Sequence, residues 1–320
     1  MSVLVYTELA EGQFKKSSLE AIFYGSKVAA QIGGSMTVLA IGSASDEELA
    51  KAGNFGAIKV LHVNDANLAA ENIMAYSKVL SETAKSLSAQ IVISAKSSLA
   101  DAVMARAAGA LKAGLVGNVV DLPNTTGGFK VKRSIFTGKA FAETSITSDV
   151  KFIAIKKNVL AIEESLNTAS VEKTSVDTGS LTSSSKVLET IKATGTVSLP
   201  EADLVVSGGR GMKGPENWQP LLDLAEALGA ATACSKPVSD LDWRPHHEHV
   251  GQTGVKVAPN LYIACGISGA IQHLAGVNSS KVIVVINKDP EAPFFKAADY
   301  GIVGDVFDVL PKLTAAVKAL

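Results

Sequence analysis

Short apolar runs alternate with longer amphipathic stretches along the first hundred residues. The apolar runs are rich in Val, Ile and Leu, and the stretches between them repeat apolar residues at helical spacing. This alternation predicts strands joined by helices, and therefore a mainly parallel sheet. We expect strands at 3–6, 36–41, 57–63 and 90–94, and helices at 17–32, 46–52, 69–87 and 100–111.

The pattern changes between residues 118 and 155, where the helical spacing disappears. Gly, Asn and Asp residues, which favour turns, separate short runs of β-forming residues there. We therefore expect antiparallel strands added to the first sheet, at 119–122, 129–135, 140–147 and 152–155.

Residues 165–185 are dominated by Ser, Thr, Asp, Glu and Lys and show no apolar periodicity. Such a composition is typical of a linker between domains, although part of it could instead lie along a partner subunit. We expect a scaffold and partner-docking domain at 1–160, a Ser/Thr-rich linker at 161–190 and a second domain at 191–320.

A second series of alternating elements follows the linker. It predicts strands at 203–206, 230–234, 261–265, 281–286 and 300–303, and helices at 216–228, 267–276 and 306–319. The fold class is thus α/β, with two domains that each hold a mainly parallel sheet and a Rossmann-like domain at the C-terminal end. Polar candidates follow several of these strands, at the edge where open parallel sheets bind ligands.

Composition and charge limit the classes of function that the chain can have. Of the 320 residues, 47% are hydrophobic and 5% aromatic, which fits two α/β cores, and the net charge of −1 without a basic stretch excludes an obvious nucleic-acid surface. The chain shows no signal segment and no apolar stretch of bilayer length, so we expect a soluble, cytoplasmic protein. Cys234 and Cys265 lie far apart without a pairing motif, which favours buried free thiols.

The strongest candidate for chemistry is the stretch after residue 265. An apolar run leads into Gly266-Ile-Ser-Gly269 and a predicted helix, so backbone N–H groups would converge on an anion. Ser268, Gln272 and His273 add polar groups, and Gly208-Gly-Arg-Gly211 adds a cation after another strand. Taken singly, each has an ordinary explanation, since serines cap helices and glycines make turns.

Five stretches carry a resemblance to a known family: 207–211, 250–254, 266–276, 286–293 and 298–305. They include Ser207-Gly-Gly-Arg-Gly211 and Gly266-Ile-Ser-Gly-Ala-Ile-Gln-His-Leu-Ala-Gly276. In this order they resemble the α subunit of electron-transfer flavoproteins, the FAD-carrying half of a heterodimer.

The resemblance implies where FAD binds. It puts Arg210 near the pyrophosphate and flavin, Thr253 near flavin N5, His273 at the N1 and O2 edge of the flavin, and Asn287 and Asp305 on the adenosine half. The whole implied set is Arg210, Ser235, Lys236, Val250, Gly251, Gln252, Thr253, Ser268, Gly269, Ala270, Ile271, Gln272, His273, Asn287, Asp305 and Val306.

The chain departs from the family pattern at one of these positions. Cys234-Ser-Lys-Pro-Val238 aligns with a family Ser-Arg motif, so Lys236 stands where an arginine usually faces the flavin. A guanidinium is planar and permanently charged, whereas an ammonium is a strongly hydrated point charge. We expect Lys236 to support a reduced flavin less well, unless its side chain points to solvent and Arg210 supplies the charge.

The resemblance also implies a function, that of an electron carrier without an organic substrate of its own. It implies a β subunit as partner, one FAD per heterodimer and AMP in the β subunit. Electrons would come from dehydrogenases such as the acyl-CoA dehydrogenases of fatty acid β-oxidation, and would pass to a membrane quinone oxidoreductase. Three alternatives stay open: an electron-bifurcating flavoprotein whose β subunit holds a second flavin, a flavin- or thiamine-dependent enzyme, and a noncatalytic nucleotide-binding protein.

The segment His246-His-Glu-His249 groups four potential metal ligands. Zinc sites usually draw two separated pairs of ligands, and no cysteine lies close to this segment in sequence. We therefore expect a loop without a metal. The chain also lacks a Gly-x-Ser-x-Gly nucleophile motif and a Walker-type phosphate loop.

Overall fold

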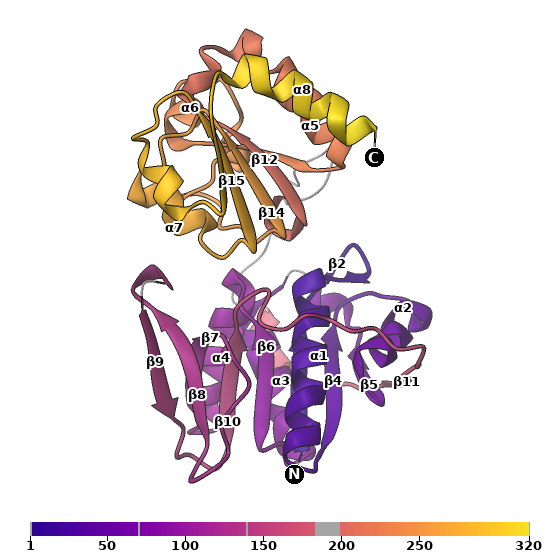
Figure 1. The fold of residues 1–320 in the computed structure, drawn as a ribbon. Helices are drawn as coiled ribbons and strands as arrows, with labels where there is room; N and C mark the ends of the chain where they lie inside the picture. The colour runs from indigo at the N-terminus through magenta and orange to yellow at the C-terminus, as the bar shows by residue number, and fades with distance from the viewer. Residues whose placement is uncertain (1, 70, 139, 183–198, 320) are drawn as a thin grey trace. The chain divides into compact units, whose positions relative to one another are not determined.

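Two α/β units make up the chain, Met1–Thr190 (unit 1) and Ile191–Leu320 (unit 2), as Figure 1 shows. The structure is a computed structural model that describes residues 2–69, 71–138, 140–182 and 199–319. Each unit carries its own sheet and its own hydrophobic cores. The expected α/β class with two sheets is confirmed.

Unit 1 holds a sheet of nine strands in the order β11-β5-β4-β1-β6-β10-β7-β8-β9. The predicted alternation forms its parallel part, in which Val3 and Val5 of β1 face one core with α1, and Leu4 and Tyr6 face the other with α3 and α4. The elements are β1 (Ser2–Thr7), a small hairpin of β2 (Leu9–Ala10) and β3 (Gln13–Phe14), α1 (Lys16–Gln31), β4 (Ser35–Ile41), α2 (Asp46–Ala50), β5 (Lys59–Val63), α3 (Ile73–Ser86), β6 (Ile91–Ala95) and α4 (Ser98–Ala110).

The expected start of α3 at residue 69 is wrong by four residues. Asn72 caps the helix instead, because its Oδ1 accepts hydrogen bonds from the N–H groups of Met74 and Ala75 at 2.9 and 3.2 Å. Asparagine at this position satisfies backbone donors that the first helical turn leaves free.

Three of the four strands expected to be antiparallel form, and they divide into two kinds; the fourth, expected at 119–122, does not form within the described residues, because the strand at that place is Gly114–Val119 and ends where the expected one begins. β8 (Lys130–Ile135) and β9 (Ala140–Ser145) are antiparallel, as predicted. β10 (Lys151–Ile155) is not, because it pairs in parallel with β6 on one side and with β7 (Gly114–Val119) on the other. Phe152 and Ile153 of β10 enter opposite cores, and a strand buried on both faces is typical of a parallel sheet.

Part of the expected linker forms a strand of unit 1. β11 (Ser170–Lys173) pairs in parallel with β5 at the edge of the nine-stranded sheet. Just before it, the backbone of Thr168 and Ala169 packs directly on Gly53. Backbone hydrogen bonds therefore join the expected linker to the rest of unit 1 between residues 165 and 174, and residues 183–190 lie outside the described residues.

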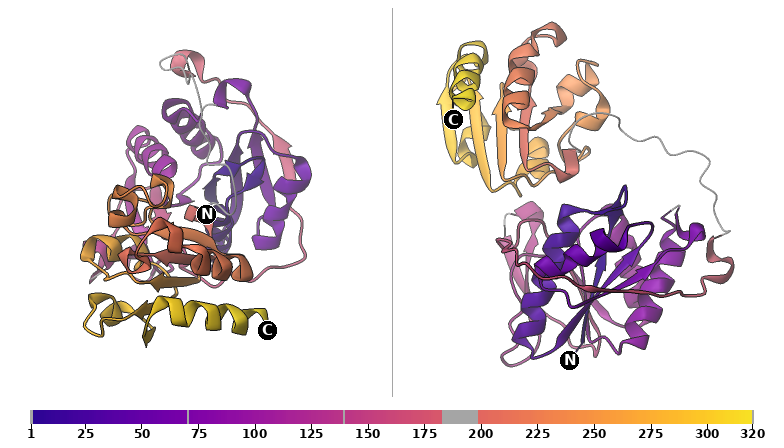
Figure 2. Two further views of the ribbon diagram at one scale, coloured as in Figure 1. Left: turned by 90° about the horizontal axis from the view of Figure 1, so that it is seen from above. Right: turned by 90° about the vertical axis from the view of Figure 1, so that its right-hand side faces the viewer.

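Unit 2 is built on a five-stranded parallel sheet in the order β13-β12-β14-β15-β16. Helices α5 and α8 lie side by side on one face, and α7 covers the other (Figures 1 and 2). The elements are β12 (Leu204–Gly208), α5 (Gln219–Leu228), β13 (Ala231–Cys234), α6 (Lys236–Asp240), β14 (Leu261–Cys265), α7 (Ile271–Val277), β15 (Val282–Asn287), β16 (Tyr300–Val303) and α8 (Val306–Lys318).

The strand order gives unit 2 a topological switch point at the carboxyl ends of β12 and β14, which we call its crevice. β12 has its successor β13 on one side and β14 on the other, so the connections leave in opposite directions at the carboxyl ends of β12 and β14. Doubly wound sheets bind ligands at such a point. Cys234 and Cys265 end β13 and β14 on opposite sides of β12; both are free, and burial raises the pKa of each thiol to about 12.

The interior position of β10 predicts a large difference between two phenylalanine truncations. Phe152→Ala in β10 should lower the free energy of unfolding by about 3–5 kcal/mol, because a fully buried ring leaves a cavity. Phe141→Ala on the antiparallel strand β9, where the ring is 58% exposed, should cost less than about 1 kcal/mol. Urea unfolding of both variants measures this, and equal losses would contradict an interior β10.

Candidate functional site

The carboxyl ends of the five strands of unit 2 carry most of the residues predicted to bind the cofactor. These residues are distant in sequence, and they meet because parallel strands end at one edge of the sheet. Arg210 follows β12, Ser235 and Lys236 follow β13, 268–273 follow β14, Asn287 ends β15, and Asp305 and Val306 follow β16.

Backbone contacts join the loops after β12 and β14. The Gly209 N–H donates to the Cys265 carbonyl at 2.9 Å, and the Gly211 N–H donates to the Gly266 carbonyl at 3.0 Å. A Cβ on Gly211 would lie 2.6 Å from Cα of Gly266, so only glycine permits this approach. The floor of the crevice is therefore bare backbone, from which the Arg210 side chain extends exposed.

The helix expected at 267–276 begins later, at Ile271, and this changes the role of Ser268. Gly269 has a left-handed φ of +82°, which interrupts a helix, and Ala270 takes the N-cap position. Ser268 is thus not a helix cap but an exposed residue of the loop.

Five exposed polar side chains at this edge have no hydrogen-bond or ion-pair partner among the described residues. They offer one guanidinium, two amides and two hydroxyls, which suit an extended ligand with phosphates and polar rings. This set consists of Arg210, Gln252, Thr253, Ser268 and Gln272. The donor and acceptor set therefore fits FAD.

The loop 250–254 is tied to both neighbouring segments. The Val250 N–H donates to the Cys234 carbonyl at 3.0 Å, and the Gln252 N–H donates to the Gln272 carbonyl at 2.7 Å. A Cβ on Gly276 would lie 2.6 Å from Cα of Gly251, so the loop lies directly on α7. These contacts bring Gln252 and Thr253 beside the segment 268–273.

His273 is buried, and its environment keeps it neutral. Its Nε2 lies 2.9 Å from the Tyr262 hydroxyl, and its Nδ1 has no hydrogen-bond partner among the described residues. Burial lowers the pKa of His273 to about 4, and nearby His249 acts in the same direction. At neutral pH this imidazole is a hydrogen-bonding group and carries no charge.

Lys236 begins α6 and holds a partner on the same helix. Its ammonium lies 2.8 Å from Asp240, and its side chain is 58% exposed. Exposed pairs of this kind contribute little to stability, so a ligand could redirect the lysine. The adjacent Ser235 is buried, and its N–H donates to the Gly208 carbonyl at 3.0 Å.

Asp305 and Asn287 both have structural roles at this edge. Asp305 caps α8 through the Phe307 N–H at 3.0 Å and lies 2.5 Å from the ammonium of Lys288; the hydrogen bond from Lys288 is the main cause of its lowered pKa. Asn287 donates to the Ile267 carbonyl at 3.0 Å. Lys213 also approaches Asp305, at 3.7 Å.

Lys213 and Lys288 were not among the residues predicted from the sequence. Both are exposed cations at the ligand edge, and both approach the same oxygen of Asp305. Their only signal in the sequence is position, since one lies three residues after Arg210 and the other directly after Asn287.

The segment 246–249 is held by contacts within the protein. Arg244 binds the Glu248 carboxylate through Nε at 2.8 Å and Nη2 at 2.5 Å, and Nδ1 of His246 lies 2.7 Å from the Ser239 hydroxyl. Among the residues that the structure describes, no three His, Cys, Asp or Glu side chains converge as metal ligands.

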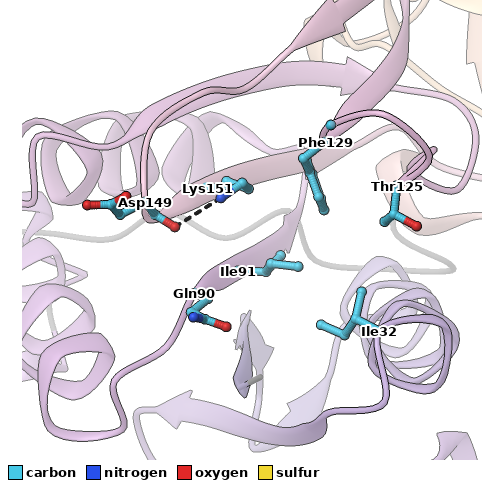
Figure 3. Close-up of a pocket in the computed structure, with 8 residues that line it drawn as sticks. Ile32, Gln90, Ile91, Thr125, Phe129, Asp149 and Lys151 are labelled. Carbon is cyan, nitrogen blue, oxygen red and sulfur yellow. Dashed lines mark hydrogen bonds between the residues drawn. The ribbon is translucent and has the colours of Figure 1, made fainter.

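Unit 1 contains a cavity of about 340 Å³ that includes none of the predicted residues (Figure 3). It lies where β6 and β10 begin, and the Lys151 ammonium donates to the Ser148 and Asp149 carbonyls at 2.8 and 3.0 Å. Its lining consists of Ile32, Gln90, Ile91, Thr125, Gly128, Phe129, Asp149 and Lys151. No helix in the described part of the chain has the length and apolar character needed to cross a bilayer.

Comparison with known proteins agrees with this division. Residues 3–179 match the family model of the electron transfer flavoprotein domain, and residues 198–278 match that of the electron transfer flavoprotein FAD-binding domain. The second match covers the strands β12 to β14 and the loops that form the crevice.

Three relatives match along nearly the whole chain. The electron transfer flavoprotein subunit alpha of Bacillus subtilis is 38% identical over 99% of this chain and 98% of its own length. That of Pseudomonas aeruginosa is 38% identical over 99% and 100%, and Protein FixB of Clostridium saccharobutylicum is 36% identical over 99% and 96%. The chain belongs to the electron transfer flavoprotein α-subunit family, and unit 2 holds its FAD-binding domain.

The lowered pKa of His273 predicts a pH-dependent part of the stability. Protonating His273 costs more free energy in the folded protein than in the unfolded chain. The contribution of neutral His273 to the free energy of unfolding is therefore complete above pH 6.5 and is lost as the pH falls toward 4. The loss should be on the order of 3 kcal/mol. His273→Gln should remove this component of the wild-type pH dependence.

Urea unfolding at pH 7 and pH 4.5 measures this difference. The matched control is His247→Gln, because His247 is exposed and its replacement should leave the pH dependence unchanged. A His273→Gln variant with the full wild-type pH dependence would show that His273 is not the titrating group.

Proposed function

We propose that this chain is the FAD-carrying subunit of a heterodimeric electron carrier. The observation that carries the proposal is the row of unpartnered polar side chains at the carboxyl edge of unit 2, within and beside a matched FAD-binding domain. Bound FAD would supply the redox chemistry, and the chain would bind it, orient it and adjust its potential.

Different residues at the carboxyl edge of the unit 2 sheet would bind different parts of FAD. Arg210 would bind the pyrophosphate, where a fork of N–H donors suits phosphate oxygens. Ser268, Gly269 and Ala270 would form the cradle, with Gln252 and Thr253 donating and accepting toward the polar edge of the flavin. Asn287 and Asp305 would lie on the adenosine half.

Two members of the set act through their protonation or charge. Neutral His273 would hold a hydrogen bond at the N1 and O2 edge of the flavin and would not add a fixed positive charge. Lys236 would act as a cation only after turning from Asp240. The remaining proposed contacts are Ser235, Val250, Gly251, Ile271, Gln272 and Val306.

The partners form part of the same proposal and are supported by family membership. A β subunit would complete the heterodimer and hold AMP, with one FAD per heterodimer. Dehydrogenases, including acyl-CoA dehydrogenases of fatty acid β-oxidation, would donate electrons, and a membrane quinone oxidoreductase would accept them. We propose that the carrier works in the cytoplasm and turns over no organic substrate of its own.

A flavin count on the coexpressed heterodimer tests the function. We expect a yellow protein with one FAD, and Arg210→Ala should weaken FAD binding at least about tenfold, because a charged donor is lost. Arg106→Ala, an exposed arginine in unit 1, is the matched control and should bind FAD normally. A colourless heterodimer would contradict the proposal, and two flavins would favour the bifurcating alternative.

The Lys236 position predicts a shift in the flavin potential. Lys236→Arg should raise the one-electron potential of the flavin, because a guanidinium can lie flat on a ring and stays charged. The corresponding gain in free energy should be on the order of 1 kcal/mol. Lys236→Met should lower it. Reductive titration across pH measures both, with the exposed Lys312→Arg as control. Identical potentials in both variants and the wild type would show that Lys236 does not face the flavin.

A further inference from the structure

Unit 1 has the same kind of crevice as unit 2, at the carboxyl ends of β1 and β6. β1 has its successor β4 on one side and β6 on the other, as β12 has β13 and β14. Ligands of doubly wound sheets bind at this point. In unit 2 the residues after the first strand are glycines and an exposed arginine, whereas in unit 1 the first strand is followed by Glu8.

The Glu8 carboxylate is buried in this crevice, with 9% of the residue exposed. Its Oε1 accepts hydrogen bonds from the Ser97 hydroxyl and from the Ala100 N–H, the latter at 3.1 Å. Its Oε2 lies 2.6 Å from the Lys15 ammonium. The two oxygens therefore receive a hydroxyl, a backbone N–H and a cation.

The backbone of Glu8 is fixed as firmly as its side chain. Its N–H donates to the Ser18 hydroxyl at 2.8 Å. Its carbonyl accepts from the Lys15 N–H at 3.1 Å and from the Ser18 hydroxyl at 3.1 Å. These contacts hold the carboxylate in one place over the first turn of α4.

The donors that meet Glu8 are those that proteins use to bind phosphate. Ala100 lies in the first turn of the 13-residue helix α4, whose N-cap is Ser97. The N-terminal end of a helix favours an anion, and a nearby lysine and hydroxyl add to that preference. Glu8 thus places its negative charge at the N-terminal end of α4, a position that favours anions.

We propose that Glu8 is a built-in anion that fills the ligand crevice of unit 1 and closes it to phosphate groups. The two crevices then differ in their polar groups: that of unit 2 leaves polar side chains unpartnered for a ligand, and in that of unit 1 Glu8 takes up the donors. This inference concerns unit 1 and does not depend on what unit 2 binds.

Chemical rescue tests the proposal in the full chain purified with its partner subunit. Glu8→Ala removes two carbons and two oxygens, the same heavy atoms that acetate contains. Acetate should raise the melting temperature of Glu8→Ala by a few degrees relative to chloride at equal ionic strength, because a ligand that binds only the folded state stabilises it. The wild type should show no such difference.

Glu48→Ala is the matched control. Glu48 also combines a lysine partner, Lys51 at 2.6 Å, with a backbone N–H from Phe14 at 3.1 Å, but it belongs to α2, which follows β4, and among the described residues it accepts no hydrogen bond from α4. Acetate should not rescue it. If acetate stabilises Glu8→Ala no more than Glu48→Ala, the carboxylate is an ordinary structural ion pair and the proposal fails.

Inorganic phosphate provides the second measurement. It should stabilise Glu8→Gly, which leaves the most space, more than it stabilises the wild type. Equal stabilisation would overturn the closure of the crevice. If the alanine and glycine variants do not fold, Glu8→Ser keeps a hydroxyl for Lys15 and should be rescued by acetate in the same way; absence of rescue there would also count against the proposal.

Discussion

The close approach of two glycine loops is the constraint on which the site of unit 2 depends. The Gly211 N–H reaches the Gly266 carbonyl at 3.0 Å, and any side chain on either residue would separate the loops after β12 and β14. With the loops in contact, the crevice has a backbone floor, and Arg210 and Ser268 extend from it into solvent. The arrangement of these loops therefore depends on glycine, which has no side chain, at both positions.

The two units show how similar sheet topologies take different roles. Each places the end of its first strand at the point where connections diverge, but one end carries glycines and the other carries Glu8. A helix N-terminus needs an anion or other acceptor in either case. In unit 1 that acceptor comes from within the protein, through the Glu8 carboxylate.

The sequence predicted where the loops meet more reliably than it predicted the contacts of the side chains on them. Glycines after strands predicted the loops, and the loops do meet at one edge. The partners of individual side chains were not predictable, because they come from other segments: Tyr262 beside His273, and Lys288 beside Asp305. The pairing of Lys236 with Asp240 was accessible in principle from their spacing of four residues.

By itself, the sequence determined the alternation of strands and helices, since apolar spacing reflects which face of each element is buried. Its glycines also determined that the loops after β12 and β14 can touch, because no other residue allows that contact. Tertiary structure alone decided that β10 is an interior parallel strand and that β11 joins the sheet from a segment without apolar periodicity. Strand partners lie far away in the chain, and local spacing carries no record of which distant backbone will supply the hydrogen bonds.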